Sequence, residues 1–202
     1  VVVRDVLAER IATLRRGEVP IYEPELADLI ARNAGRLSFT IDVAEAIDGA
    51  DFVYVAVGTP PTYSGDADLS RVMGVVEELE QVGTGANHVL VMKSTVPVGT
   101  GERVRAELDA RGLGGVGYCS NPEFLKEGTA VDDFLKPDRV VIGTEDPAVE
   151  MVMRQLYEPF VRTGNLVFIS GHLARQDGKP WIGQLGLTMT TAEGQAAARA
   201  IA

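Results

Sequence analysis

Two carboxylates four residues apart, Glu123 and Glu127, stand in SNPEFLKEGTAVDDFLKPDRVVIG at residues 120–143. If residues 124–128 form one helical turn, both carboxylates project from the same face. A carboxylate pair beside Lys126 could orient or activate a water molecule. The alternative is a solvated acidic loop, which is the commoner role of this spacing. The pair carries more weight here because a strand-like segment and an Asn-Pro turn precede it.

Other residues could complete such a site. Phe124 and Leu125 could wall an apolar slot beside the carboxylates. In AVGTPP, residues 56–61, an apolar run ends at Gly58, which lets a ligand approach the backbone, and Pro60 stiffens the exit. A rigid turn without a ligand is the alternative for this segment.

The stretch KSTVPVGT, residues 93–100, repeats this arrangement after the next apolar run. Ser94 and Thr95 place two hydroxyls at a predicted strand end. Gly99 and Thr100 then open a predicted helix whose free N–H groups could face an anion. An ordinary strand-to-helix connection capped by Thr100 is the alternative.

Asp5 follows the apolar run VVV and Arg4 at the start of the chain. An acid at the end of the second strand of a doubly wound sheet can accept both hydroxyls of an adenosine ribose. The Gly-rich phosphate loop expected about 20 residues earlier does not precede it. Asp5 is therefore either a ribose ligand in a domain without its first strand or a helix N-cap.

Apolar runs that alternate with helical patterns indicate the elements that must position these residues. Strands are expected at residues 1–4, 36–40, 51–58, 88–94, 116–120, 138–143 and 166–170. Helices are expected at residues 7–17, 20–33, 42–49, 68–83, 99–112 and 147–160, the fourth with Asp68 as N-cap. Continuous apolar strands alternating with helices predict an α/β, doubly wound, Rossmann-like parallel sheet covered on both faces.

Composition limits the partners of this 202-residue chain. Its net charge of −10 disfavours nucleic acid and anionic membranes as partners. No apolar run approaches the roughly 18 residues of a transmembrane helix. Cys119 is the only cysteine, which fits a reducing cytoplasm and is expected to be an inert buried thiol. Neither His88 nor His172 lies in a cluster with metal-ligand spacing, so no metal is expected.

Four segments together identify a family resemblance: RRGEVPIYEPEL, DFVYVAVGTPP, KSTVPVGT and SNPEFLKEGTAVDDFLKPDRVVIG. Their order and spacing resemble the UDP-glucose/GDP-mannose dehydrogenase family. This resemblance implies NAD as cofactor and a nucleotide sugar as substrate, with UDP-glucose favoured. The implied reaction oxidises the C6 alcohol to the acid in two hydride transfers through a cysteine-bound intermediate. It also implies a homodimer for full-length members.

The resemblance also implies a set of site residues. The cofactor contacts are Asp5, Arg10, Gly58, Thr59, Pro60, Thr95 and Glu127. The residues implied in catalysis are Thr95 and Glu123, which would hold a water molecule, and Glu127 on the nicotinamide side. The substrate contacts are Glu123, Phe124, Leu125, Lys126 and Glu127.

The chain also departs from the family pattern. The first strand, the G-x-G-x-x-G turn and the later nucleophilic cysteine are not found at their family positions, so the chain alone is expected to be inactive. Residues 1–165 are predicted to be the NAD-binding domain, and residues 166–202 a hairpin-plus-helix tail resembling the start of a Rid (YjgF-like) domain. The alternatives are a non-catalytic truncated or fused module and a Rid-type imine deaminase.

The first strand is central in a sheet of order 3-2-1-4-5-6. Burial of the five or six apolar residues of such a strand would contribute about 10 kcal/mol to the stability of the fold, at ~1.5–3 kcal/mol per residue. A whole domain is stable by only ~5–15 kcal/mol. The strand ending at Asp5 and the strand 51–58 should therefore each expose an unpaired edge, which the tail strand is one candidate to cover.

Overall fold

The computed structural model describes residues 1–83, 88–157, 166–169, 175–176 and 179–180. The strands are β1 Val2–Arg4, β2 Ser38–Thr40, β3 Phe52–Val55, β4 Val89–Met92, β5 Gly117–Ser120, β6 Val140–Gly143, β7 Leu166–Ile169, β8 Arg175–Gln176 and β9 Lys179–Pro180. The helices are α1 Ala8–Arg15, α2 Leu26–Arg32, α3 Val43–Ile47, α4 Ser70–Val82, α5 Thr100–Ala110, α6 Ala130–Leu135 and α7 Pro147–Tyr157, with a 3₁₀ turn, η1, at Ala34–Arg36.

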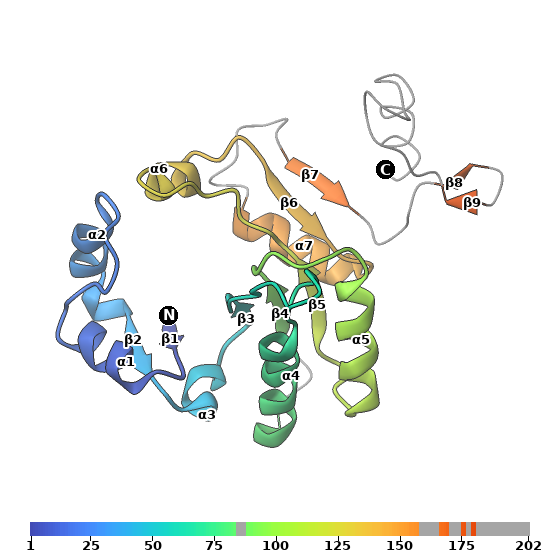
Figure 1. Ribbon diagram of the computed structural model, residues 1–202, viewed down its shortest axis with the longest axis horizontal. Helices are drawn as coiled ribbons and strands as arrows, with labels where there is room; N and C mark the ends of the chain where they lie inside the picture. The colour runs from blue at the N-terminus through green and yellow to red at the C-terminus, as the bar shows by residue number, and fades with distance from the viewer. Residues whose placement is uncertain (84–87, 158–165, 170–174, 177–178, 181–202) are drawn as a thin grey trace.

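The strands form two separate parallel-dominated sheets and one small hairpin. β1 and β2 pair in parallel, and β3 to β7 form a five-stranded sheet in sequence order. Figure 1 shows the β1–β2 unit, with α1 and α2, beside the larger sheet. Among the described residues, no strand lies between β1 and β3 to join the two sheets by hydrogen bonds. The tail strand β7 pairs with β6 at the opposite edge, so the idea that it covers the exposed edges is wrong.

The predicted α/β architecture is confirmed, with one correction to strand direction. β3, β4 and β5 are parallel, but β6 runs antiparallel to β5, with Ser120 opposite Gly143. A parallel connection needs a crossover that covers a face of the sheet. The segment 121–139 makes no such crossover, because its helix α6 lies beyond the sheet (Figure 1). The following helix, α7, does cross, and β7 is parallel to β6.

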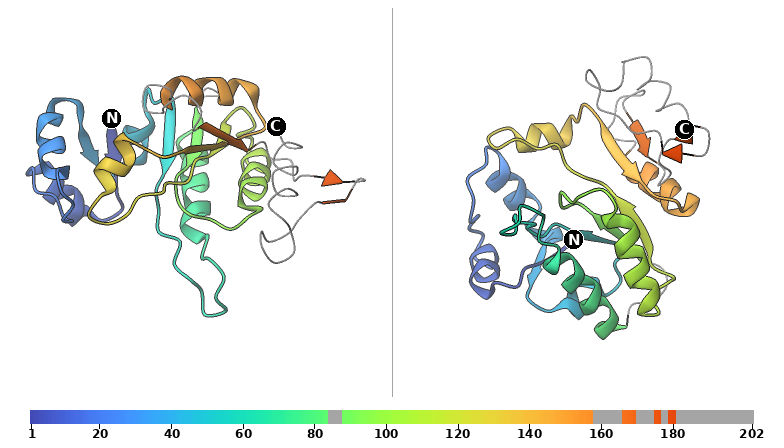
Figure 2. Two further views of the ribbon diagram at one scale, coloured as in Figure 1. Left: turned by 90° about the horizontal axis from the view of Figure 1, so that it is seen from above. Right: turned by 45° about the vertical axis from the view of Figure 1, so that its right-hand side comes forward.

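Helices cover both faces of the larger sheet, as predicted. Alternate side chains of β4 point to opposite faces. Leu90 and Met92 are buried against α4 and α5, whereas Val91 is buried against Cys119 and α7. Figure 2 shows α7 on one side of the strands and α4 and α5 on the other. This double burial explains why the strands have continuous apolar sequences.

Local signals position most helices close to their predicted bounds. The buried residues of α4, Val72, Val76 and Leu79, recur at helical spacing. α4 begins at Ser70 with Leu69 as its N-cap, so the prediction of Asp68 as N-cap is wrong by one residue. The Asp68 carboxylate still contacts its start, because it accepts a hydrogen bond from Ser70 N at 2.9 Å. Gly83, with φ +70°, ends α4 in the left-handed conformation that glycine tolerates.

Candidate functional site

The loops after β3 and β4 are hydrogen-bonded to each other at the carboxyl ends of these two strands. Thr59 Oγ1 donates to the Thr95 carbonyl at 2.7 Å. Ser94 Oγ accepts from Val57 N at 2.8 Å and donates to the Val57 carbonyl at 2.7 Å. These bonds bring together the two strand exits that the sequence singled out. The carboxyl ends of parallel strands are where open α/β sheets bind ligands.

Gly58 makes close packing possible at the first of these exits. A Cβ added at Gly58 would meet Arg71 Nη1 at 3.1 Å, which is tighter than most Cβ contacts. Pro60 follows, and its carbonyl accepts from Asp68 N at 2.9 Å. The exit is therefore held from both sides, as its glycine and prolines suggested.

Asp5 follows β1 and stays ionised. Its carboxylate accepts from Leu7 N at 2.8 Å and pairs with Arg10 Nη1 at 2.6 Å. Partial burial alone would raise the pKa of Asp5, but the Leu7 hydrogen bond and the Arg10 pair outweigh it and lower the pKa below 3.8. A carboxylate has about four acceptor positions, so these two bonds leave room for ribose hydroxyls. The N-cap of α1 is Leu7, so the interpretation of Asp5 as the helix N-cap is wrong, although its carboxylate accepts from the N–H of that residue. The ribose role stays a prediction.

A cavity of about 480 Å³ lies where the segment after β5 meets β6 and α7. Polar side chains at one end are Tyr54, Lys93, Asn121 and Tyr157. Apolar walls include Phe124, Leu125, Phe134 and Leu156. The Arg139 guanidinium lies over the Phe124 ring, 4.8 Å from its centroid. The cavity therefore combines apolar walls with polar and charged side chains, the charged ones including Glu123 and Asp133.

Asn121 is the hub of the polar end of the cavity. It is fully buried. Its Oδ1 accepts from Tyr157 OH at 2.6 Å and from Lys93 Nζ at 3.2 Å, and its Nδ2 donates to the Val141 carbonyl at 2.7 Å. Tyr54 OH lies 3.4 Å from Tyr157 OH and extends this network. One side chain thus ties together β4, β6 and α7 at the cavity floor.

Lys93 and Glu123 bring opposite charges to this cavity. Burial lowers the pKa of Lys93, and the charge of Glu123 partly opposes that shift. Glu123 Oε2 is buried and has no hydrogen-bond partner among the described residues. A buried carboxylate oxygen without a partner costs free energy. A ligand hydroxyl or a water molecule in the cavity would supply the missing donor.

The structure separates the two glutamates that the sequence paired. Residues 121–126 have no regular structure, and the turn comes only at 127–129, so the predicted helical turn at 124–128 is wrong. Glu123 lines the cavity, whereas Glu127 is exposed and is not a lining residue. Gly128 takes φ +85°, which lies outside right-handed helical backbone, so a helical turn cannot include it.

Some of the remaining predicted residues line the cavity and others do not. Phe124, Leu125 and Lys126 line the cavity. Thr95 is exposed and does not line it, although Lys93, two residues earlier, does. Within the described part of the chain, Thr95 and Glu123 share no hydrogen bond, so a shared water molecule remains a prediction.

Sequence reasoning missed α6 and most of the polar network. Thr129 directly before AVDDFL is a helix-start signal that could have located α6. A lysine that follows the buried run VLVM could have drawn attention to Lys93. Tyr54 and Tyr157 gave no such signal, because aromatic residues in strands and helices are usually core.

Comparison with known proteins shows to which family this chain is related. Residues 1–161 match the NAD binding domain of the UDP-glucose/GDP-mannose dehydrogenase family. The chain is 48% identical over 171 residues to a UDP-glucose 6-dehydrogenase of Pseudomonas aeruginosa, covering 81% of this chain and 37% of that protein. It is 40% identical over 164 residues to UDP-glucose 6-dehydrogenase TuaD of Bacillus subtilis, covering 79% of this chain and 35% of that protein.

The chain belongs to the UDP-glucose/GDP-mannose dehydrogenase family. Its fold matches a UDP-glucose dehydrogenase of Pyrobaculum islandicum at 38% identity and TM-score 0.73, covering 84% of this chain and 40% of that chain. It matches a ternary complex of GDP-mannose dehydrogenase of Pseudomonas aeruginosa at 31% identity and TM-score 0.75, with the same coverage of 84% and 40%. The chain thus spans about two fifths of the length of these family members.

One glycine motif of this dehydrogenase-family chain is misleading. The letters GLGGVG at residues 112–117 fit G-x-G-x-x-G. A phosphate loop runs from a strand into a helix. Here the motif runs from α5 into β5. It therefore lies at the amino end of the strand, whereas open α/β sheets bind ligands at the carboxyl ends. Its last glycine serves packing instead, because a Cβ at Gly117 would lie 2.6 Å from Val149 Cγ2.

Two further findings concern metals and membranes. Among the described residues, no three His, Cys, Asp or Glu side chains gather as a metal ion would require. In the same part of the chain, no helix is long and apolar enough to cross a bilayer.

Proposed function

We propose that this chain is the cofactor-binding part of an NAD-dependent nucleotide-sugar 6-dehydrogenase, with UDP-glucose as the favoured substrate. The observation that carries the proposal is the buried, unpartnered oxygen of Glu123 at the edge of a cavity with apolar walls. In a member of this family, that oxygen would accept a hydrogen bond from the substrate or from a water molecule beside it. NAD, when bound, supplies the acceptor for the hydride that leaves the substrate.

The residues of this chain would then divide into cofactor and substrate contacts. Asp5 would accept the ribose hydroxyls, held in place by Arg10, while Thr59 and Thr95 would contact the cofactor at the strand ends. Glu123 and Thr95 would share a water molecule. Gly58 and Pro60 would shape the cofactor side, and Glu127 would contact the nicotinamide side.

The segment 124–127 would form the edge of the nucleotide-sugar site. Phe124 and Leu125 already provide apolar walls, and Lys126 contributes a cation at the rim. The domain boundary at 165 stays a prediction. The pairing of β7 with β6 favours a boundary after Ile169. Most of residues 166–202, with the Rid-like motifs, lies outside the described residues.

The chain alone should bind NAD but should not catalyse oxidation of the nucleotide sugar. Its only cysteine, Cys119, is fully buried in β5, and burial raises the pKa of its thiol to about 12. Such a thiol is not a nucleophile at neutral pH. This supports the non-catalytic alternative for the isolated chain. We also infer a cytoplasmic location and a homodimer in the full-length protein.

Titration calorimetry with NAD tests the cofactor role. Asp5→Asn should weaken NAD binding by about tenfold, which is the loss of a charged hydrogen bond. Asp28→Asn on the exposed side of α2 is the matched control and should leave the affinity unchanged. If titration of the unmodified chain with NAD gives no saturable binding, the proposed cofactor role is contradicted. Steady NADH formation with UDP-glucose would contradict the expected lack of turnover.

A further inference from the structure

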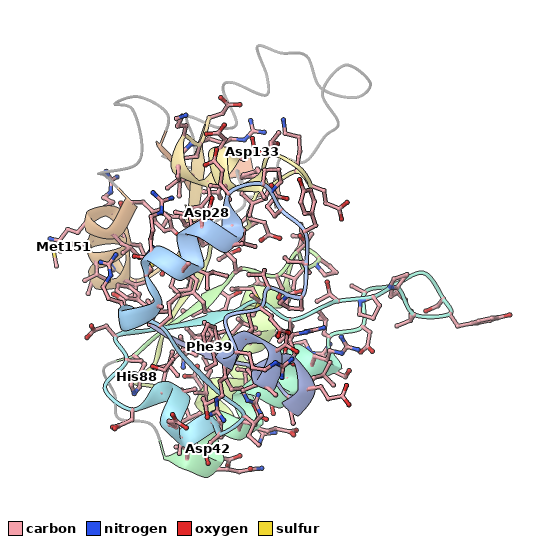
Figure 3. All side chains as sticks on the ribbon, turned by 90° about the vertical axis from the view of Figure 1, so that its left-hand side faces the viewer. Asp28, Phe39, Asp42, His88, Asp133 and Met151 are labelled. Atoms are coloured by element: carbon pink, nitrogen blue, oxygen red, sulfur yellow. The ribbon has the colours of Figure 1, made fainter. Side chains whose placement is uncertain are left out.

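Glu23 joins two parts of the molecule that share no strand pairing. It lies in the segment before α2, close in sequence to the unit that carries Asp5. Its Oε2 accepts from Gly128 N and its Oε1 from Ala130 N, both at 2.8 Å. Figure 1 shows α2 facing α6 across this junction. In Figure 3, Asp28 marks α2 and Asp133 marks α6 on the same side of the molecule.

The two bonds suit the chemistry of both partners. The first N–H groups of a helix have no partner within the helix, and a carboxylate is favoured there. Glu23 satisfies the N–H of Ala130, the first residue of α6, and that of Gly128 in the turn before it. Charged acceptors make the stronger kind of hydrogen bond. The bidentate arrangement also fixes the direction of the turn.

The segment 124–127 is held at its two ends and by two contacts within it, of which one is the Arg139 guanidinium over the Phe124 ring. At one end, the buried Asn121 side chain is bonded to Lys93 after β4, to Val141 of β6 and to Tyr157 of α7. At the other end, Gly128 is bonded to Glu23. Within the segment, the Lys126 N–H donates to Asp133 at 3.0 Å, which ties the segment to α6 but not to the sheet. The position of the cavity edge therefore depends on where Glu23 holds α6.

We propose that Glu23 is a positioning residue that holds the cavity edge, residues 124–127, against the part of the chain that carries Asp5. The side chain itself is not a lining residue of the cavity. Its effect on a nucleotide sugar would act through the backbone of Gly128 and Ala130. This inference rests on the proposed function, because that function makes residues 124–127 part of the nucleotide-sugar site.

Amide hydrogen exchange on the full 202-residue chain tests the clamp without any ligand. Glu23→Gln replaces one acceptor oxygen with an NH₂ group, which cannot accept from a backbone N–H. Exchange should accelerate about tenfold at one or both of Gly128 and Ala130, since Gln keeps one acceptor oxygen; tenfold corresponds to roughly 1.4 kcal/mol of local stability. Exchange at Asn121, whose N–H donates to the Met92 carbonyl at 2.9 Å, should stay unchanged.

Glu25→Gln is the matched control, because it removes the same charge two residues away from an exposed side chain. It should leave exchange at Gly128 and Ala130 unchanged. Unchanged exchange at these amides in Glu23→Gln would overturn the proposal. Equal acceleration at Asn121 would also overturn it, because Glu23 would then support only global stability.

Titration with UDP-glucose supplies the functional readout. Its affinity should fall several-fold in Glu23→Gln and not in Glu25→Gln. NAD affinity should fall less than UDP-glucose affinity in Glu23→Gln, because Glu127 alone in this segment is assigned to the cofactor, and should not change in Glu25→Gln. An unchanged UDP-glucose affinity in Glu23→Gln would overturn the positioning role. If the unmodified chain binds neither UDP-glucose nor NAD, the proposed function fails, and the exchange comparison still decides whether Glu23 is a clamp.

Discussion

Arg4 of β1 forms a bidentate ion pair with Glu78 of α4, with Nη1 to Oε2 at 2.8 Å and Nη2 to Oε1 at 2.7 Å. The two residues belong to parts of the molecule whose strands are not paired with each other. With less than a third of each side chain exposed, this pair is better shielded from water than a typical surface pair. Together with Glu23, it connects the β1–β2 unit to the larger sheet.

Arg4→Ala should therefore loosen the β1–β2 unit. We expect a loss of about 1 kcal/mol in the free energy of unfolding, because the pair is only partly buried. Urea unfolding followed by circular dichroism measures this loss. The control is Arg16→Ala, which removes an exposed pair with Glu18 within one segment and should leave the midpoint unchanged. Equal midpoints for both variants would show that the Arg4 pair does not hold the unit.

Replacing the hub of the cavity floor should have a larger effect. Asn121→Leu leaves the Val141 carbonyl, Tyr157 OH and Lys93 without their partner in a buried place. We expect a loss of about 2–4 kcal/mol in the free energy of unfolding, since several polar groups lose their bonds at once.

Tyr157→Phe is the graded comparison for the hub. It removes the Tyr157 hydroxyl, which donates to Asn121 at 2.6 Å, and keeps the ring. A loss of about 1 kcal/mol is expected, as for one hydrogen bond. If Tyr157→Phe costs as much as Asn121→Leu in urea unfolding, Asn121 is not the centre of the network.

The sequence predicted the sheet better than the site for a physical reason. Burial on both faces makes each strand a local apolar run, as in Val89–Met92, so strands can be read from a few adjacent letters. The network of Lys93, Asn121 and Tyr157 joins residues 28 and 36 positions apart, and no local spacing encodes such contacts. The Glu123–Glu127 spacing misled because backbone geometry around it decided the conformation.

Gly117 should tolerate no side chain, because of its close approach to α7. A Cβ there would lie 2.6 Å from Val149 Cγ2. Valine is confined to one rotamer in a helix, so its methyl group cannot turn away. Gly117→Ala should cost about 1–3 kcal/mol of unfolding free energy by overpacking. Gly35→Ala, which meets nothing within 4 Å, should cost much less in the same urea titration.

The double variant Gly117→Ala/Val149→Ala separates overpacking from strand propensity. Removal of the Val149 methyl groups clears the space, so the cost of the double variant should be smaller than the sum of the two single costs. Additive costs would mean that the Val149 contact is not the cause.

Alkaline pH should weaken the fold through Cys119. Burial raises the pKa of this thiol from 9.0 to about 12, despite opposing contributions from the Gly143 N–H and Lys93. Between these values the unfolded chain has lost the thiol proton and the folded chain keeps it. The unfolded state then binds fewer protons, so stability falls as pH rises. Below pH 9.0 this contribution is fully present.

Cys119→Ala isolates this contribution. The variant loses packing at neutral pH, so it starts less stable, but it has no thiol to titrate. The difference in urea midpoint between the unmodified chain and the variant should therefore shrink from neutral pH to about pH 10.5. Burial also raises the pKa of Tyr118, to about 12, with a smaller contribution from Cys119. The larger contribution, burial, is common to both proteins and cancels in the difference. Parallel pH curves for the two proteins would mean that the Cys119 thiol does not remain protonated in the folded state.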